Sequence, residues 1–394
     1  MILSSAVGAE DAALLTDTIR AVLGKADPAD GRVERVYRDG PFDRDLWSVL
    51  GAEIGIGALA VPESAGGLGA SFAAVAAALE LLGSELTRIP MVGSVVAAAA
   101  LGRCADHPYA AELLAGLAAG RTVVATVLSG VPTPGGHGSA FRVDRIGNDS
   151  VVTGSAEFVL DGDVADTVLL HAADESGTLG LYAVDRADIA VHRMEATDPT
   201  RILSRLEIGA APATLLTDRP APETLRDRAL VALACDSLGV ARACLDTAVE
   251  YAKNRVQFGR VIGGFQAIKH MLAEVAVAVE LADSAVSHAV WAVEEGTEHE
   301  LAEAAAIAAL ACGDAADLAT ATNIQVHGGI GFTWEHTAHL YYRRALTSSV
   351  LWGTADDHAQ RLYLLATGSA PSAADAPTTE RLREPASALF ATEP

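Results

Sequence analysis

The sequence predicts an α+β protein built from an N-terminal helical domain, a middle β-sandwich or barrel domain, and a C-terminal four-helix bundle. Apolar residues recur at three- and four-residue spacing in residues 11–120 and again after residue 222, as they do on one face of a helix. Between these stretches, short β-branched runs are separated by Gly, Asp, Asn and Pro, which is typical of strands and turns. We therefore expect domains at residues 1–120, 121–222 and 223–368.

Turn signals divide the first domain into several helices. These signals are Pro62, Gly66, Gly67, Gly69 and Pro90. The middle domain contains five runs that read as strands, and several of them alternate between apolar and polar residues. They are TVVATVL, SVVTGSAEFVL, DTVLLHAA, LGLYAVD and IAVHRM.

The last domain is expected to contain four long helices joined by short connections, which is the pattern of a bundle. The expected helices span about residues 226–255, 264–295, 300–327 and 335–367. In the first of them, Val231, Leu238, Leu245 and Val249 fall on one face. Residues 369–394 are rich in Ala, Pro, Ser, Thr and Glu without periodicity, so we expect a disordered tail.

Composition excludes several classes of partner. The 394 residues carry a net charge of −23, which disfavours binding to nucleic acid or to an anionic membrane, because such binding relies on clustered Lys and Arg. No basic and apolar leader begins the chain, and no run of about twenty uninterrupted apolar residues follows. The four cysteines, Cys104, Cys235, Cys244 and Cys312, have neither CxxC pairing nor matched histidine spacing. We expect buried thiols, no metal site and a cytoplasmic location.

Four segments give the chain a family resemblance. They are GALAVPESAGGLGAS at residues 57–71, LGSELTRIP at residues 82–90, YAKNRVQFGRVIGGFQAIKHMLAEV at residues 251–275 and QVHGGIGF at residues 325–332. Together with the order of the three domains, they resemble the flavin-dependent acyl-CoA dehydrogenases over residues 11–367. The resemblance implies an acyl-CoA dehydrogenase-like fold, an FAD cofactor, an acyl-CoA substrate and an electron-transferring flavoprotein as acceptor.

In this family each FAD lies across a subunit interface, and the surface that a chain lends to its neighbour's flavin looks intact. Arg255 resembles the arginine that meets the FAD diphosphate, a task that suits a planar guanidinium. Phe258 and Gln266 match positions beside the adenosine. Gln325, Gly328 and Gly329 resemble the loop that receives the adenine and ribose. The alternative is that Arg255 is a surface charge and that the glycines only cap a helix.

The surface for the chain's own flavin ring looks degraded. The family usually has a Thr-Glu-Pro-like turn and then a Trp followed by a hydroxyl residue, whereas this sequence has ATVLSGVPTPGG and AEFVLDGDVAD. Val159 falls at the Trp position and Asp161 near the hydroxyl position. This exchange would remove stacking area and would place a carboxylate near a flavin that becomes anionic on reduction.

The glutamate that removes the α-proton of the thioester is absent from both positions that the family uses. One position holds Trp352, and the other falls at Ala229 and Leu230, none of which can take a proton. Asp236, within an apolar run, is a weak candidate for a relocated base, because a buried carboxylate should be paired or functional. Asp356 and Asp357 read as helix N-terminal charges.

Three histidines lie in or near these segments. His327 lies in the glycine loop, His270 ends the FQAIKH segment and His358 follows the two aspartates. A satisfied structural histidine is the commoner explanation for His327 and His270, and no two of the three have metal-ligand spacing on one helix face.

Three functions fit these observations. The first is the glutamate-less subunit of an α2β2 acyl-CoA dehydrogenase, which resembles bacterial enzymes that act on steroid side-chain or other bulky acyl-CoA thioesters. The second is a self-sufficient homotetramer that uses Asp236 as its base. The third is a non-catalytic structural homologue, which the detailed adenosine-side residues argue against.

Overall fold

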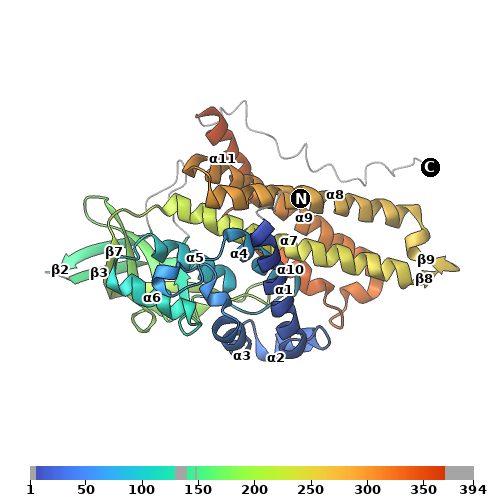
Figure 1. Ribbon diagram of the computed structural model, residues 1–394, viewed down its shortest axis with the longest axis horizontal. Coiled ribbons are helices and arrows are strands. Elements are labelled where there is room, and N and C mark those ends of the chain that lie inside the picture. Colours follow the sequence, from blue (N-terminus) through green and yellow to red (C-terminus); the bar gives the residue numbers. More distant parts are fainter. Residues whose placement is uncertain (1–5, 129–139, 147–148, 369–394) are drawn as a thin grey trace.

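The computed structural model describes residues 6–128, 140–146 and 149–368. Figure 1 shows the β-rich part at one end of an elongated molecule, the N-terminal helices packed alongside, and the long helices α7, α8 and α9 running toward the other end. The expected α+β chain with helical first and last parts is confirmed. The expected tail, residues 369–394, lies outside the described residues.

Six α-helices form the N-terminal part. They are α1 (Ala6–Ala26), α2 (Arg32–Asp39), α3 (Arg44–Trp47), α4 (Phe72–Ser84), α5 (Met91–Gly102) and α6 (Pro108–Ala118). Helix α4 starts after Ser71, whose side chain accepts a hydrogen bond from the Ala74 N–H, as an N-cap residue should. Helices α4 and α5 are apolar on nearly all sides because they lie between the other helices and the bundle.

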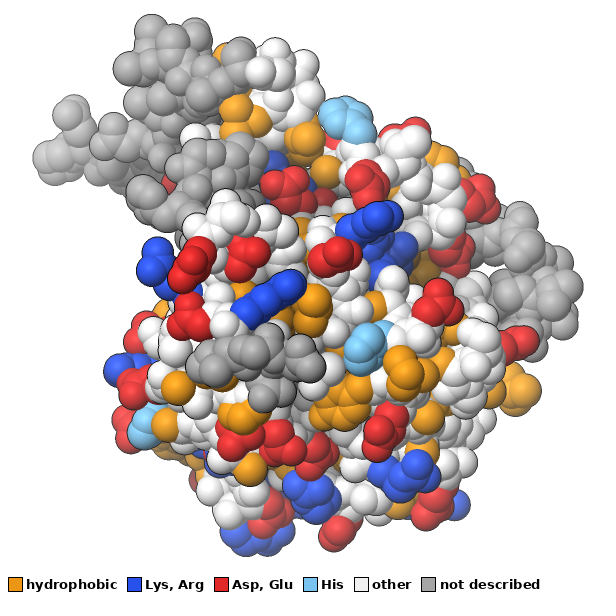
Figure 2. Space-filling model, turned by 90° about the vertical axis from the view of Figure 1, so that its left-hand side faces the viewer, with side chains coloured by type: hydrophobic (Ala, Val, Ile, Leu, Met, Phe, Trp, Pro, Cys, Tyr) orange, Lys and Arg blue, Asp and Glu red, His pale blue; other side chains and the backbone are white. Residues whose placement is uncertain are grey.

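Within the described residues, seven strands form the middle part, and five of them close into a barrel. The strands are β1 (Val124–Thr126), β2 (Phe141–Ile146), β3 (Asp149–Leu160), β4 (Thr167–Ala173), β5 (Leu179–Asp185), β6 (Ala190–Arg193) and β7 (Leu203–Thr217). The ring runs β2-β3-β7-β5-β4 and returns to β2, while β1 pairs with β4 and β6 with β7. A closed ring leaves no long free strand edge. In Figure 2, which faces this end, acidic and basic side chains are interspersed among apolar ones.

The C-terminal part contains three long helices and two shorter ones. They are α7 (Pro222–Asn254), α8 (Gln266–Glu294), α9 (Glu298–His327), α10 (Ala338–Ser348) and α11 (Ala355–Thr367), with a hairpin of β8 (Val256–Gln257) and β9 (Arg260–Val261) between α7 and α8. The fourth expected helix is therefore two helices. The chain breaks because Trp352 and Gly353 have positive φ angles of 67° and 136°, and because Thr354 and Asp357 form a capping box that starts α11.

Helices α8 and α9 are long and apolar enough by composition to cross a membrane, and 44% and 50% of their most apolar windows are buried. Core helices of a bundle pass the same test, and these two pack against each other and α7. All four cysteines are free and buried, as expected.

Two glycines let α4 and α7 approach each other closely. A Cβ added at Gly239 of α7 would overlap the backbone carbonyl of Glu80, and one added at Gly83 of α4 would overlap the carbonyl of Asp236. Backbone atoms in two packed helices have no room to move aside. This crossing fixes the N-terminal part against the bundle.

Replacing Gly239 by Ala should therefore lower the free energy of unfolding by about 1–3 kcal/mol through overpacking. Gly313 of α9 is the matched control, because a Cβ there meets nothing within 4 Å. Gly313→Ala should be neutral or stabilising by up to about 1 kcal/mol. Urea unfolding of both variants checks this, and equal effects would contradict the tight crossing.

Candidate functional site

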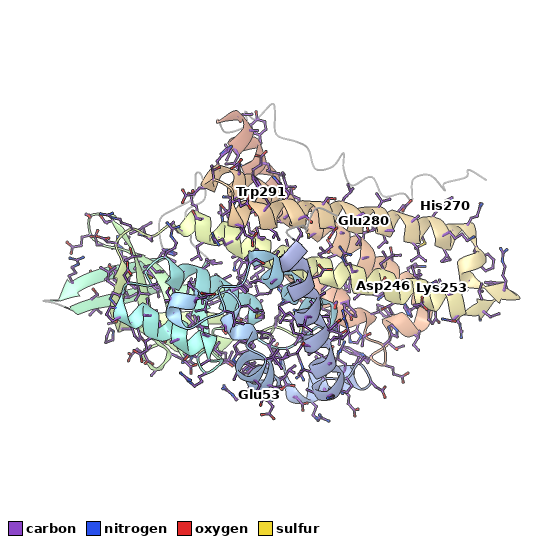
Figure 3. All side chains as sticks on the ribbon, in the orientation of Figure 1. Glu53, Asp246, Lys253, His270, Glu280 and Trp291 are labelled. Atoms are coloured by element: carbon purple, nitrogen blue, oxygen red, sulfur yellow. The ribbon has the colours of Figure 1, made fainter. Side chains whose placement is uncertain are left out.

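The residues expected to contact a neighbour's cofactor all lie at one end of the bundle. Helix α7 ends there, the β8–β9 hairpin follows, α8 begins at Gln266, and α9 ends at His327. A small apolar cluster joins the three helix ends. Its members are Ala248, Ala252 and Val326, with Tyr251, Ile262, Ile268 and Leu272 packed against them. In Figure 3, the labels of Lys253 and His270 mark this end. Ala252 and Val326 belong to one cluster here, so segments about seventy residues apart in the sequence meet.

The six residues face outward. They are Arg255, Phe258, Gln266, Gln325, Gly328 and Gly329. The carbonyl of Arg255 accepts a hydrogen bond of 2.8 Å from the Ile262 N–H, which ties the hairpin to the end of α7. The Arg255 guanidinium forms no ion pair within the described part of the chain, so its planar donor fork is available to a ligand outside the chain.

The tip of the hairpin carries an aromatic ring in a strained position. Phe258 and Gly259 have φ angles of 53° and 77°, as the two central residues of a type I′ turn require. Asn or Gly normally fills the first of these positions, and a larger residue costs on the order of 1–3 kcal/mol. The Phe258 side chain is 92% exposed, and its ring meets that of Phe265 edge-on with the centroids 6.0 Å apart. Packing within the chain therefore does not account for Phe258.

The glycine loop is open for the same kind of contact. A Cβ added at Gly328 or Gly329 would meet nothing within 4 Å, and only Gly328 has a positive φ angle, 63°. Neither crowding nor conformation calls for glycine at position 329. The backbone here is free to approach a ligand closely. A guanidinium for phosphates, an exposed ring for stacking and a bare backbone together fit half of an FAD site.

His327 supports this loop from beneath. Its Nδ1 lies 2.8 Å from the carbonyl oxygen of Asn323, and its ring lies 4.2 Å from that of Tyr251 and 4.3 Å from that of His336. Burial lowers the pKa of His327. It is a satisfied structural histidine. His270 is exposed on α8, whereas His358 is buried beneath Gly353 and burial lowers its pKa. Among the described residues, no group of His, Cys, Asp and Glu could hold a metal ion.

The surface expected for the chain's own flavin ring differs from the sequence-based account. Val159 is 2% exposed and belongs to the core, so it cannot form a wall beside a ligand. A bulge in β3 instead turns Phe158 outward, with φ of 57° and 54% exposure. The aromatic residue at this position was missed because a bulge shifts the alternation of side chains. Most of the ATVLSGVPTPGG stretch lies outside the described residues.

Asp161 is buried and not a fixed negative charge. Its carboxylate lies against Gly93 in the first turn of α5. Burial raises the pKa of Asp161 to about 7, although Arg201 and Arg344 act in the opposite direction. The carboxylate expected near the ring is therefore buried, and its raised pKa means that it is partly protonated near neutral pH.

The two family positions for the base lie close together. Trp352 packs against the apolar cluster that contains Ala229 and against the one that contains Leu230 and Leu351. Neither position offers a carboxylate. Asp357 is the capping residue of α11, since its Oδ2 accepts hydrogen bonds from the Thr354 N–H and hydroxyl at 2.8 and 2.7 Å. These hydrogen bonds lower the pKa of Asp357, and Asp356 is exposed in the same turn.

Asp236 is a structural carboxylate and not the relocated base considered above. Its side chain forms ion pairs with Arg201 of the β6–β7 loop and Arg344 of α10, and Arg344 also donates to Thr200. Burial opposes ionisation, but the two guanidiniums outweigh it and hold the pKa of Asp236 below its usual value. A base needs a raised pKa, so this environment disfavours proton abstraction.

Asp236→Asn should mainly destabilise the fold, by about 3–5 kcal/mol, because the buried Arg344 loses its ion pair and Arg201 keeps the longer one, 3.9 Å to Asp198. The control is Asp283→Asn, which breaks a half-exposed pair with Arg242 and should cost about 1 kcal/mol or less. Urea unfolding measures both. Unchanged stability with abolished turnover would restore Asp236 as a base.

Asp161→Asn should stabilise the protein in a pH-dependent way. A raised pKa in the folded state means that the protonated Asp161 carboxyl contributes stability at low pH, which is lost as the pH rises through about 7. Asn stays neutral and tolerates the left-handed backbone at this position, φ 61°. The variant should gain about 1–2 kcal/mol over the wild type above that pKa, and less near pH 5. A difference in the free energy of unfolding between variant and wild type that does not change with pH would contradict this.

Comparison with known proteins identifies the family. The model for the acyl-CoA dehydrogenase N-terminal domain matches residues 9–121, and that for the C-terminal domain matches residues 226–363. Acyl-CoA dehydrogenase IpdE2 of Mycobacterium tuberculosis is 33% identical over 355 residues, which cover 90% of this chain and 96% of that protein.

Two solved structures share the fold. The Tcur3481-Tcur3483 steroid ACAD superposes with a TM-score of 0.81 at 28% identity, covering 91% of this chain and 98% of that one. The ChsE4-ChsE5 complex from Mycobacterium tuberculosis gives 0.80 at 28% identity, covering 94% and 100%. This chain belongs to the acyl-CoA dehydrogenase family, whose members are FAD-dependent oxidoreductases that act on acyl-CoA.

Proposed function

We propose that this chain is the glutamate-less subunit of a hetero-oligomeric acyl-CoA dehydrogenase. Its bundle end binds the diphosphate and adenosine of an FAD whose flavin ring lies in a homologous partner chain. That partner supplies the catalytic glutamate. The bundle end has an open set of residues suited to binding the cofactor, whereas Trp352, Ala229 and Leu230 stand at the two family positions for the base and none of them is a carboxylate.

Each residue at the bundle end has a role in this proposal. Arg255 neutralises the diphosphate, Phe258 and Gln266 lie beside the adenosine, and the Gly328–Gly329 backbone with Gln325 receives the adenine and ribose. FAD, when held there, would supply the hydride acceptor for dehydrogenation of the acyl group. This chain takes no part in proton removal, which falls to the partner's glutamate.

The relatives support a mixed assembly and a bulky substrate. One related structure is a ChsE4-ChsE5 complex, and another is a steroid ACAD. We therefore propose a steroid side-chain or similarly bulky acyl-CoA as substrate, and an electron-transferring flavoprotein as acceptor. A cytoplasmic location suits the four free cysteines, which a reducing compartment would keep unpaired.

The alternatives are weaker. A homotetramer with its own base would rely on Asp236, which two arginines hold as a stable carboxylate. A purely structural homologue would have no reason to keep an exposed Phe258 in a strained turn.

Arg255→Ala should lower the FAD content of the mixed assembly by about tenfold or more at limiting FAD, because a charge-assisted phosphate contact is lost. Lys253→Ala is the matched control, since this lysine at the same helix end pairs with Glu250 on the surface. It should leave FAD content unchanged. Flavin absorbance per assembly measures the FAD content of both variants. Unchanged FAD content in Arg255→Ala would contradict the assignment of Arg255 to the diphosphate.

A further inference from the structure

A cleft of about 300 Å³ lies where the N-terminal part meets the bundle. Helices α4 and α5 form one side, and α7 and α8 form the other. Small apolar residues make up most of its lining, among them Ala60, Ala70, Val75, Val95 and Ala99. The volume is at the lower end of the range for ligand pockets, about 300–1,000 Å³. The cleft suits a narrow hydrocarbon group.

Arg228 of α7 is the cationic group in this cleft, and it lacks a carboxylate partner within the described residues. Its Nη2 donates to the backbone carbonyl of Val293 at 3.2 Å, which uses one of its five N–H donors. Burial lowers the pKa of Arg228, and the like charge of Arg103 lowers it further. Both influences disfavour the cation, and no ion pair with a carboxylate among the described residues balances them.

The acidic residue of the cleft has a different partner. The Oε1 of Glu294 accepts a hydrogen bond of 3.3 Å from the Ala73 N–H, in the first turn of α4, where a negative charge is favourable. Glu294 forms no ion pair with Arg228. The free donors of Arg228 are therefore available to a ligand.

An unpaired, partly buried guanidinium is costly unless something outside the chain compensates it. It is also unusual in a protein with 51 Asp and Glu against 28 Lys and Arg, where acidic partners are abundant. A guanidinium pairs best with a carboxylate, through two parallel hydrogen bonds. A phosphate would ask for more donors than one arginine among alanines and valines provides.

We propose that this cleft binds a free apolar carboxylate, with the carboxylate on Arg228 and the hydrocarbon along Val75, Val95 and Ala99. Every residue of the site belongs to one chain, so the proposal does not depend on the pairing of subunits proposed above. The ligand would occupy a chain that has no base, so its binding is not followed by dehydrogenation at this site.

Decanoate is the probe, and isothermal titration against the full chain measures its affinity. Decan-1-ol, which has the same chain without the charge, should bind more weakly by about tenfold or more. Arg228→Met keeps the apolar stem and removes the charge, so it should weaken decanoate by about tenfold or more while leaving decan-1-ol unchanged. Arg103→Met is the matched control and should change decanoate affinity by no more than about twofold.

A second variant separates ligand binding from folding. Ala99→Phe narrows the cleft from the α5 side and leaves Arg228 unsubstituted, so it should abolish binding of both probes while thermal unfolding shows a folded protein. Equal decanoate affinity in Arg228→Met and the wild type, or no saturable binding to the wild type, would overturn the proposal. FAD content of the mixed assembly, measured on the same variants, should not change. FAD content therefore tests the subunit assignment and decanoate affinity tests the cleft, so either proposal can fail without the other.

Discussion

The buried ion pairs of Asp236 hold the three parts of the molecule together. Asp236 lies in the middle of α7, Arg344 comes from α10, and Arg201 comes from the loop that links two strands of the barrel domain. Arg344 also donates to the carbonyl of Thr87, next to the N-terminal helices. The backbone of Asp236 lies against Gly83 of α4. One residue therefore fixes the bundle, the barrel domain and the N-terminal helices in a single arrangement.

This arrangement separates two regions along α7. Near its start, Ala229 and Leu230 lie in the clusters that Trp352 covers, and the chain has apolar packing there in place of an acid. At its far end, α7 presents Arg255 and the hairpin, which the core does not cover. A rigid helix with a packed start and an open end fits a subunit that supplies a surface to a neighbour.

The sequence was sufficient for the element types, because those rest on local signals, whereas the assignment of the bundle end to FAD stays a prediction. The periodicity of the long helices and the positions of Arg255 and Gly328 can be read within a few residues. The split between α10 and α11 was missed, although the Thr354 and Asp357 capping pair was a readable signal. Phe158 was missed because bulges do not show in an alternating pattern. The partners of Asp236 were beyond reach, since Arg201 and Arg344 are 35 and 108 residues away in the chain.

The flavin-to-protein ratio of this chain, purified alone and after co-expression with a homologous subunit that carries the glutamate, tests the shared site most directly. We expect little or no FAD in the isolated chain and about one FAD for every two chains in the mixed assembly, because each flavin would draw on one surface from each of two chains. One FAD for each chain in isolation would contradict it, and would mean that this chain completes its own site.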